Sequence, residues 1–191
     1  VLFRSVVEVT ETNGETATEA NGETVTEVVE VTKPVNENND SYVGSTDSRY
    51  ILWTDISKDE DFIFQDEFIK VTFKIKDNAP ERDYPISIVP DLAANPGISL
   101  NKNTTTINGT IRVGNSIEEA NPESKDGIVV YGDNISCKPG DTVEYYVNIK
   151  DNPGVVAMLV WIYFDQNAME FVTCKPAGEF AEIAVGTKVG G

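Results

Sequence analysis

The chain has 191 residues with 40% hydrophobic content, a formal net charge of -17 at pH 7 and no histidine. Such a negative charge repels nucleic-acid phosphates and anionic lipid surfaces, so we expect no nucleic-acid partner and no membrane insertion. The lack of histidine excludes Ser-His and Cys-His nucleophile pairs and the zinc sites that use histidine.

Residues 1–39 are acidic, rich in threonine and repetitive. Asn13-Gly14-Glu15-Thr16 recurs as Asn21-Gly22-Glu23-Thr24. Such a composition cannot bury enough apolar surface to offset the entropy lost on ordering the chain. We therefore expect a disordered linker or insertion, with a β-hairpin on an Asn-Gly turn as the alternative.

From Tyr50 onward the hydrophobic pattern has a period of two, which is typical of half-buried strands. Val71, Phe73 and Ile75 alternate with lysine and threonine. Residues 84–89 form a second short segment whose prolines, Pro85 and Pro90, favour strand ends or sheet edges. Residues 105–113 keep one alternation throughout and predict a single further strand.

Residues 115–126 are polar and are interpreted as a linker. Beyond them the pattern predicts strands at 128–131, 143–149, 157–164 and 169–173, with turns at 138–141 and 151–154. No segment has a helical period, and many short strands between regular turns predict an all-β, antiparallel β-sandwich. Cys137 and Cys174 are too few for a structural zinc cluster, and unpaired thiols are favoured over a disulfide.

The segment 157–164 is apolar at both parities. Met158, Val160, Ile162 and Phe164 share one side, and Leu159, Trp161 and Tyr163 share the other. Because a sandwich strand buries one side, the second set is either covered by another segment or forms an exposed protein-binding patch. Residues 49–55 have a similar two-sided character and are expected in the same sheet.

Short motifs then follow one another along the chain. Before residue 115 they are Leu52-Trp53-Thr54-Asp55, Phe68-Ile69-Lys70-Val71-Thr72-Phe73-Lys74-Ile75-Lys76, Tyr84-Pro85-Ile86 and Asn108-Gly109-Thr110-Ile111. After residue 126 they are Lys138-Pro139-Gly140-Asp141-Thr142-Val143, Asn152-Pro153-Gly154-Val155, Tyr163-Phe164-Asp165 and Met169-Glu170-Phe171-Val172. The earlier set resembles the C-terminal half, and the later set the N-terminal half, of cohesin domains from bacterial cellulosome scaffoldins.

The resemblance implies a β-sandwich of jelly-roll topology in which the tail of a cohesin precedes its head. The implied organisation is a C-terminal part of one module at 40–114, a linker at 115–126 and an N-terminal part of the next module at 127–191. A circularly permuted single module is the alternative. The two parts can in either case dock as one sandwich.

The function implied by the resemblance is non-catalytic binding of dockerins, which are calcium-loaded helical modules attached to polysaccharide-degrading enzymes. The location implied is extracellular or on the bacterial cell surface. No cofactor or metal is implied for this chain, because the calcium belongs to the dockerin. The partner-binding residues implied by position are Ala157, Leu159, Trp161 and Tyr163, with Leu52, Thr54 and Asp55 beside them.

The residues also allow other classes of function. An aromatic strip of Trp161, Tyr163 and Trp53 would suit a carbohydrate-binding module, and a structural or adhesin spacer is a further alternative. The carboxylate runs Asp59-Glu60-Asp61 and Asp66-Glu67 are interpreted as solvated surface, because no flanking groups would raise a pKa for catalysis. We therefore expect no enzyme, and the lack of an EF-hand loop argues that the chain is not itself a dockerin.

Overall fold

The computed structural model describes residues 46–55, 62–95, 97–123 and 127–191. The segment 1–39, which we predict to be disordered, and the carboxylate run at 59–61 lie outside these residues. The described part contains one α-helix and one 3-10 helix, each of a single turn, and is otherwise built from strands and loops.

The strands and helices follow the chain from β1 to β12. The strands are β1 (Thr46–Thr54), β2 (Asp66–Ile75), β3 (Arg82–Ala94), β4 (Ile98–Ser99), β5 (Thr104–Ile107), β6 (Gly109–Val113), β7 (Ile128–Gly132), β8 (Asn134–Cys137), β9 (Thr142–Lys150), β10 (Ala157–Asp165), β11 (Met169–Pro176) and β12 (Lys188–Gly190). The helices are η1 (Asn101–Asn103) and α1 (Phe180–Ile183).

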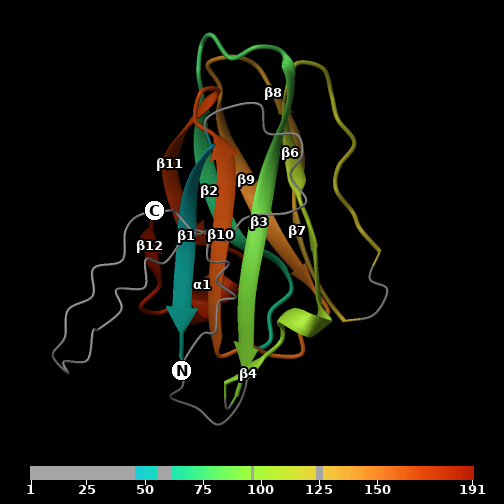
Figure 1. Cartoon of the computed structure of the whole chain (residues 1–191), viewed down its shortest axis with the longest axis vertical. Helices are drawn as coiled ribbons and strands as arrows, with labels where there is room; N and C mark the ends of the chain where they lie inside the picture. The colour runs from blue at the N-terminus through green and yellow to red at the C-terminus, as the bar shows by residue number, and fades with distance from the viewer. Residues whose placement is uncertain (1–45, 56–61, 96, 124–126) are drawn as a thin grey trace, which may run out of the picture. The chain divides into compact units, whose positions relative to one another are not determined.

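Two sheets pack against each other, which confirms the predicted all-β sandwich. The first sheet has the strand order β12-β1-β10-β3-β6-β8, with β4 attached to β3, and the second has the order β11-β2-β9-β7-β5. Figure 1 shows β1, β10 and β3 side by side at the front, with β2, β9 and β11 behind them.

The core between the sheets follows the predicted alternation. Val71, Phe73 and Ile75 of β2 are buried, whereas the intervening Lys70, Thr72 and Lys74 keep partial exposure. On β10 the predicted inward set is fully buried and belongs to the core cluster; it consists of Met158, Val160, Ile162 and Phe164. The turn at 138–141 also forms as predicted, with Gly140 at a φ of 84° and the Asp141 N–H donating to the Lys138 carbonyl.

The antiparallel assignment is wrong for two strand pairs, and so is the single strand predicted at 105–113. The chain leaves the second sheet after β5 and enters the first as β6, with Asn108 between them. It makes the same change of sheet from β7 to β8, with Asp133 between them. Because the two segments run side by side in one direction, β5 pairs with β7 and β6 pairs with β8 in parallel.

Glycine makes this double crossing sterically possible. A Cβ on Gly132 would overlap the Tyr145 hydroxyl, and a Cβ on Gly109 would overlap both that hydroxyl and the Asp133 carbonyl. The two backbones approach closely enough for the Thr110 N–H to donate to the Asp133 carbonyl at 2.9 Å. A side chain at either glycine would therefore push the crossing segments apart.

The prolines of β3 do not mark a sheet edge as predicted, because β3 lies between β10 and β6. Its residues 82–86 pair with β6 and its residues 87–93 pair with β10. On the side away from β10, the Ile88 and Leu92 N–H groups donate to the side chains of Asn108 and Asn101 rather than to a strand. Pro90 lies two residues from each of them, so its nitrogen also points away from β10. Its missing N–H therefore costs no hydrogen bond between strands.

Strands from the two sides of residues 115–126 are interleaved in both sheets. In the first sheet β1 lies between β12 and β10, and in the second β2 lies between β11 and β9. The described strands before residue 115 and after residue 126 thus share one core.

Both cysteines are free and buried, as favoured from the sequence. No helix in the described part of the chain is long and apolar enough to cross a membrane.

Candidate protein-binding face

The outer face of the first sheet is made by outward residues of β12, β1, β10 and β3. Residues opposite one another on neighbouring antiparallel strands point to the same side. The register gives four rows across the sheet: Thr54, Ala157 and Ala93; Lys188, Leu52, Leu159 and Asp91; Gly190, Tyr50, Trp161 and Val89; and Ser48, Tyr163 and Ser87.

Most of the predicted binding residues lie in these rows. Leu52 and Leu159 are directly opposite each other, and both side chains are partly exposed. Thr54 is exposed, whereas its neighbour Ala157 is only 2% exposed and offers little surface. Asp55 follows the end of β1, where its N–H donates to the Val156 carbonyl at 2.8 Å, so it lies outside the rows.

An aromatic cluster occupies the middle of the outer face. The rings of Tyr50 and Trp161 have centroids 5.0 Å apart, and those of Trp161 and Tyr163 are stacked at 6.3 Å. Gly190 lies under the Tyr50 ring, where a Cβ would be only 2.6 Å from the hydroxyl. Tyr50 was missing from the predicted site, although it has the same parity as Leu52 and strand alternation alone would have included it.

One end of the outer face is closed. Tyr163 is 9% exposed, and its neighbours Ser48 and Ser87 are 1% and 0% exposed. Burial raises the pKa of Tyr163 to about 12. Neither serine hydroxyl has a hydrogen-bond partner among the described residues. The accessible part of the face is therefore the two rows that contain Leu52 and Tyr50.

Trp53 does not belong to this face, which corrects the aromatic strip considered from the sequence. Its side chain is 1% exposed on the inner side of β1. It packs edge-on against Phe62 and Phe180, with ring centroids 5.3 and 5.2 Å away. The parity of Trp53 is opposite to that of Leu52, so the two side chains point to opposite sides of the sheet.

Two charged residues flank the leucines in the same row. Lys188 is exposed on β12, and Asp91 lies on β3. The Asp91 carboxylate accepts a hydrogen bond of 2.7 Å from the Asn101 side-chain amide. Asn101 in turn accepts the Leu92 N–H at 2.9 Å, so the position of Asp91 is fixed by the backbone of its own strand.

The outer face of the second sheet is different in character. Lys70 on β2 and Glu144 on β9 form an ion pair at 2.9 Å, and the Tyr146 hydroxyl also donates to Glu144. The hydrogen bond from Lys70 lowers the pKa of Glu144. Polar alternation of this kind is typical of a solvated sheet face. Of the two outer faces, the one on the first sheet therefore carries the apolar rows.

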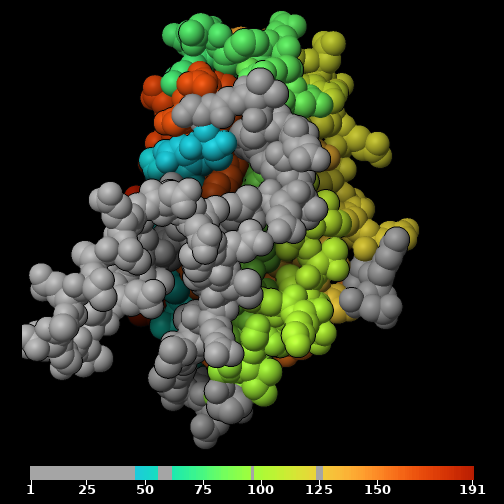
Figure 2. Space-filling model, in the orientation of Figure 1, coloured from blue at the N-terminus to red at the C-terminus, as the bar shows by residue number. Residues whose placement is uncertain are grey.

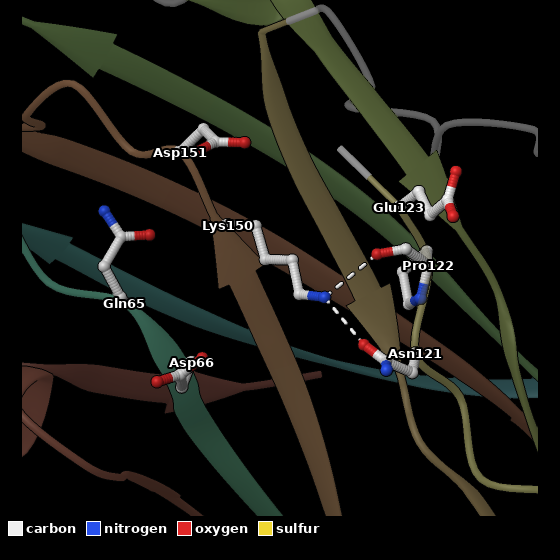
Figure 3. Close-up of a pocket in the computed structure, with 7 residues that line it drawn as sticks. All are labelled: Gln65, Asp66, Asn121, Pro122, Glu123, Lys150 and Asp151. Atoms are coloured by element: carbon white, nitrogen blue, oxygen red, sulfur yellow. Dashed lines mark hydrogen bonds between the residues drawn. The ribbon is translucent and has the colours of Figure 1, made fainter. Parts of the chain in front are cut away.

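A polar pocket lies where β2 and β9 meet residues 121–123, and Figure 3 shows Lys150 at its centre. The Lys150 ammonium donates to the Asn121 side chain and to the Pro122 carbonyl, both at 2.9 Å. It also lies 5.4 Å from the centre of the Tyr131 ring. These two hydrogen bonds attach Asn121 and Pro122 to β9. Both residues belong to the segment 115–123, drawn in yellow along one side of Figure 2.

The pocket has no evident chemical role. Asp66, Glu123 and Asp151 also line it, but a lysine ammonium already occupies its centre. No cluster of three or more acidic or cysteine side chains suited to a metal ion occurs within the described ranges.

The fold and the face together define the class, an all-β sandwich with one apolar outer face. Comparisons with protein-family models, with curated proteins and with solved structures return no match for the chain.

Proposed function

We propose that the chain is a non-catalytic binding module of a scaffoldin, which holds dockerin-bearing, polysaccharide-degrading enzymes outside the cell or on the bacterial cell surface. The observation that carries the proposal is the apolar pairing on the outer face, with Leu52 opposite Leu159 and Tyr50 opposite Trp161. All four side chains are partly exposed, and an apolar patch left accessible on a sheet face is typical of a protein-binding site. The calcium required belongs to the dockerin.

The positions of the cohesin-like motifs agree with this proposal. Lys138-Pro139-Gly140-Asp141 forms the turn between β8 and β9, and Tyr163-Phe164-Asp165 ends β10. The alternation of strands from 46–113 and 127–191 supports a single module whose halves occur in permuted order. Jelly-roll topology belongs to the same proposal.

Burial of the face would supply substantial binding energy. Removing a side chain such as Leu159 or Trp161 from water contributes about 2 kcal/mol each. Aromatic residues at the centre of an interface commonly dominate its affinity. Trp161 lies between Tyr50 and Val89 in its row, so it is the expected anchor.

The test is a tryptophan-fluorescence titration with a panel of calcium-loaded dockerins. Trp53 is buried in the core, so a change on binding reports Trp161. A saturable change that disappears when calcium is chelated supports the proposal. No change for any dockerin, from a protein whose circular dichroism shows a folded β structure, contradicts it.

A carbohydrate-binding role is the second candidate, because the Tyr50, Trp161 and Tyr163 rings form a cluster on a sheet face. It predicts sedimentation with cellulose or xylan in the absence of any protein partner. The low exposure of Tyr163 leaves Tyr50 and Trp161 to provide such a platform. A spacer role predicts instead that substitutions at Leu159 and Trp161 change no binding at all.

A further inference from the structure

We infer that the outer face selects an amphipathic helix that carries acidic side chains on the flank over β12 and basic side chains on the flank over β3. The inference rests on the proposed protein-binding role of this face. It adds Lys188 and Asp91 as the residues that determine which helix is accepted.

The width of the apolar rows matches one helix. Neighbouring strands lie about 4.8 Å apart, so β12 and β3, the outermost strands of the face, are about 14 Å from each other. An α-helix with its side chains is about 10 Å wide. A helix lying along β1 and β10 therefore fits between β12 and β3, covers Leu52 and Leu159, and has its two flanks beside β12 and β3.

The flanking positions of this row carry opposite charges. Lys188 is paired with Leu52 across β12 and β1, and Asp91 is paired with Leu159 across β3 and β10. Asp91 is held in place by Asn101, so its carboxylate is ordered before a partner arrives. The complementary helix has its acidic and basic flanks in the matching order.

Charges at the rim of an apolar interface act chiefly on partner choice. They steer the encounter and penalise partners that bring like charges together. A helix with two basic flanks meets Lys188 with like charge, and a helix with two acidic flanks meets Asp91 with like charge, in either direction along the face. Such a helix is therefore disfavoured even when its apolar stripe fits, whereas a helix with one acidic and one basic flank binds in the direction that matches both residues. Because Lys188 is exposed and Asp91 is partly exposed, the effect of their charges is screened at high salt.

The experiment uses the full chain and two synthetic helical peptides with the same leucine stripe. One peptide has glutamate along one flank and lysine along the other, and the second has glutamine at all of these positions. Binding is followed by Trp161 fluorescence at low salt and at about 0.5 M NaCl, where the Debye length is only a few ångströms.

We expect the charged peptide to bind about tenfold more tightly than the neutral one at low salt, and equally at high salt. Lys188→Glu and Asp91→Lys should each remove this preference. Lys138→Glu is the matched control for Lys188→Glu, because Lys138 is exposed in the turn before β9 and changes net charge equally. It should retain the preference.

Equal binding of both peptides, equal effects of Lys188→Glu and Lys138→Glu, or no saturable change with either peptide would each overturn the inference. The dockerin panel separates this result from the proposed function. If a dockerin binds and is unaffected by Lys188→Glu, the inference fails and the proposed function stands. If the charged peptide shows the expected selectivity while no dockerin binds, the inference stands and the dockerin assignment fails.

Discussion

Trp161 is the residue on which the proposed binding role depends most directly. It is partly exposed, it contacts Tyr50 and Tyr163, and its row lies in the accessible part of the outer face. Its backbone pairs with β1 and β3 whatever its side chain is. Truncation of Trp161 thus separates binding from folding.

Trp161→Ala should lower dockerin affinity by more than tenfold, in keeping with about 2 kcal/mol for burial of the side chain, and leave the far-ultraviolet circular dichroism unchanged. Isothermal titration calorimetry measures the affinity without the lost fluorophore. Tyr146→Ala, on the outer face of the second sheet, is the control and should bind normally. Unchanged affinity of the Trp161 variant would remove the proposed face.

The buried Cys174 thiol and Tyr163 hydroxyl make the stability of the folded chain decrease at alkaline pH. Burial raises the pKa of Cys174 from 9.0 to about 12 and that of Tyr163 from 10.0 to about 12. Between these values the unfolded chain has lost protons that the folded chain keeps, so the free energy of unfolding falls as pH rises. The contribution of these two groups to the free energy of unfolding is complete below pH 9 and is lost progressively between pH 9 and 12.

Urea unfolding at pH 8 and at pH 10.5 measures this loss. Cys174→Ala and Tyr163→Phe should each be less sensitive to pH than the parent protein, because each removes one group that ionises on unfolding. An identical pH dependence in the parent and both variants would show that neither group is buried as described.

At the scale of elements, strand alternation identified which side chains share a side but not which sheet a strand joins. The inward and outward sets of β10 follow from parity, because one buried side imposes a period of two. The change of sheet at Asn108 leaves the same alternation intact, so residues 105–113 looked like a single strand. The interior position of β3 was missed because the N–H groups on either side of Pro90, those of Ile88 and Leu92, donate to asparagine side chains rather than to a neighbouring strand.

The candidate site, like the fold, was predictable from the sequence only where it depends on local alternation. Leu52, Leu159 and Trp161 follow from local pattern, and Tyr50 would have followed from the same parity. Lys188 and Asp91 could not be found in this way, because their place in the row depends on pairing between strands far apart in the chain. The low exposure of Tyr163 depends on its surroundings in three dimensions and leaves no signal in the sequence.

Where the two segments cross between the sheets, adding a single methyl group at Gly132 should strongly destabilise the fold. Gly132→Ala should cost roughly 3 kcal/mol or more in the free energy of unfolding, because its Cβ would overlap the Tyr145 hydroxyl. Gly186→Ala has open space around it and should cost about 1 kcal/mol from its positive φ alone. Urea unfolding compares the two variants.

A second variant keeps this prediction testable if Gly132→Ala does not fold. Adding Tyr145→Phe removes the overlapping oxygen and should recover part of the lost stability or yield of folded protein. A Gly132→Ala protein as stable as the parent would contradict the close approach of the two crossing segments.

For the whole molecule, the alternation of strands makes the two parts of the chain inseparable in the folded state. Each sheet joins strands from both sides of residues 115–126. A chain cut once between residues 123 and 127 should therefore run as one species in native gel filtration, and its two fragments should separate only in denaturant. Fragments that separate in native buffer would show that they do not share a core.

The same alternation governs how the protein is made. A ribosome delivers β1 and β2 first, yet β1 pairs with β10 and β12, and β2 pairs with β9 and β11. These early strands cannot complete their pairing until the chain has been synthesised through β12, which ends at Gly190. Throughout that interval the nascent chain exposes hydrophobic strands with unpaired edges. Successful biosynthesis therefore depends on shielding β1 and β2 until β9 to β12 have emerged.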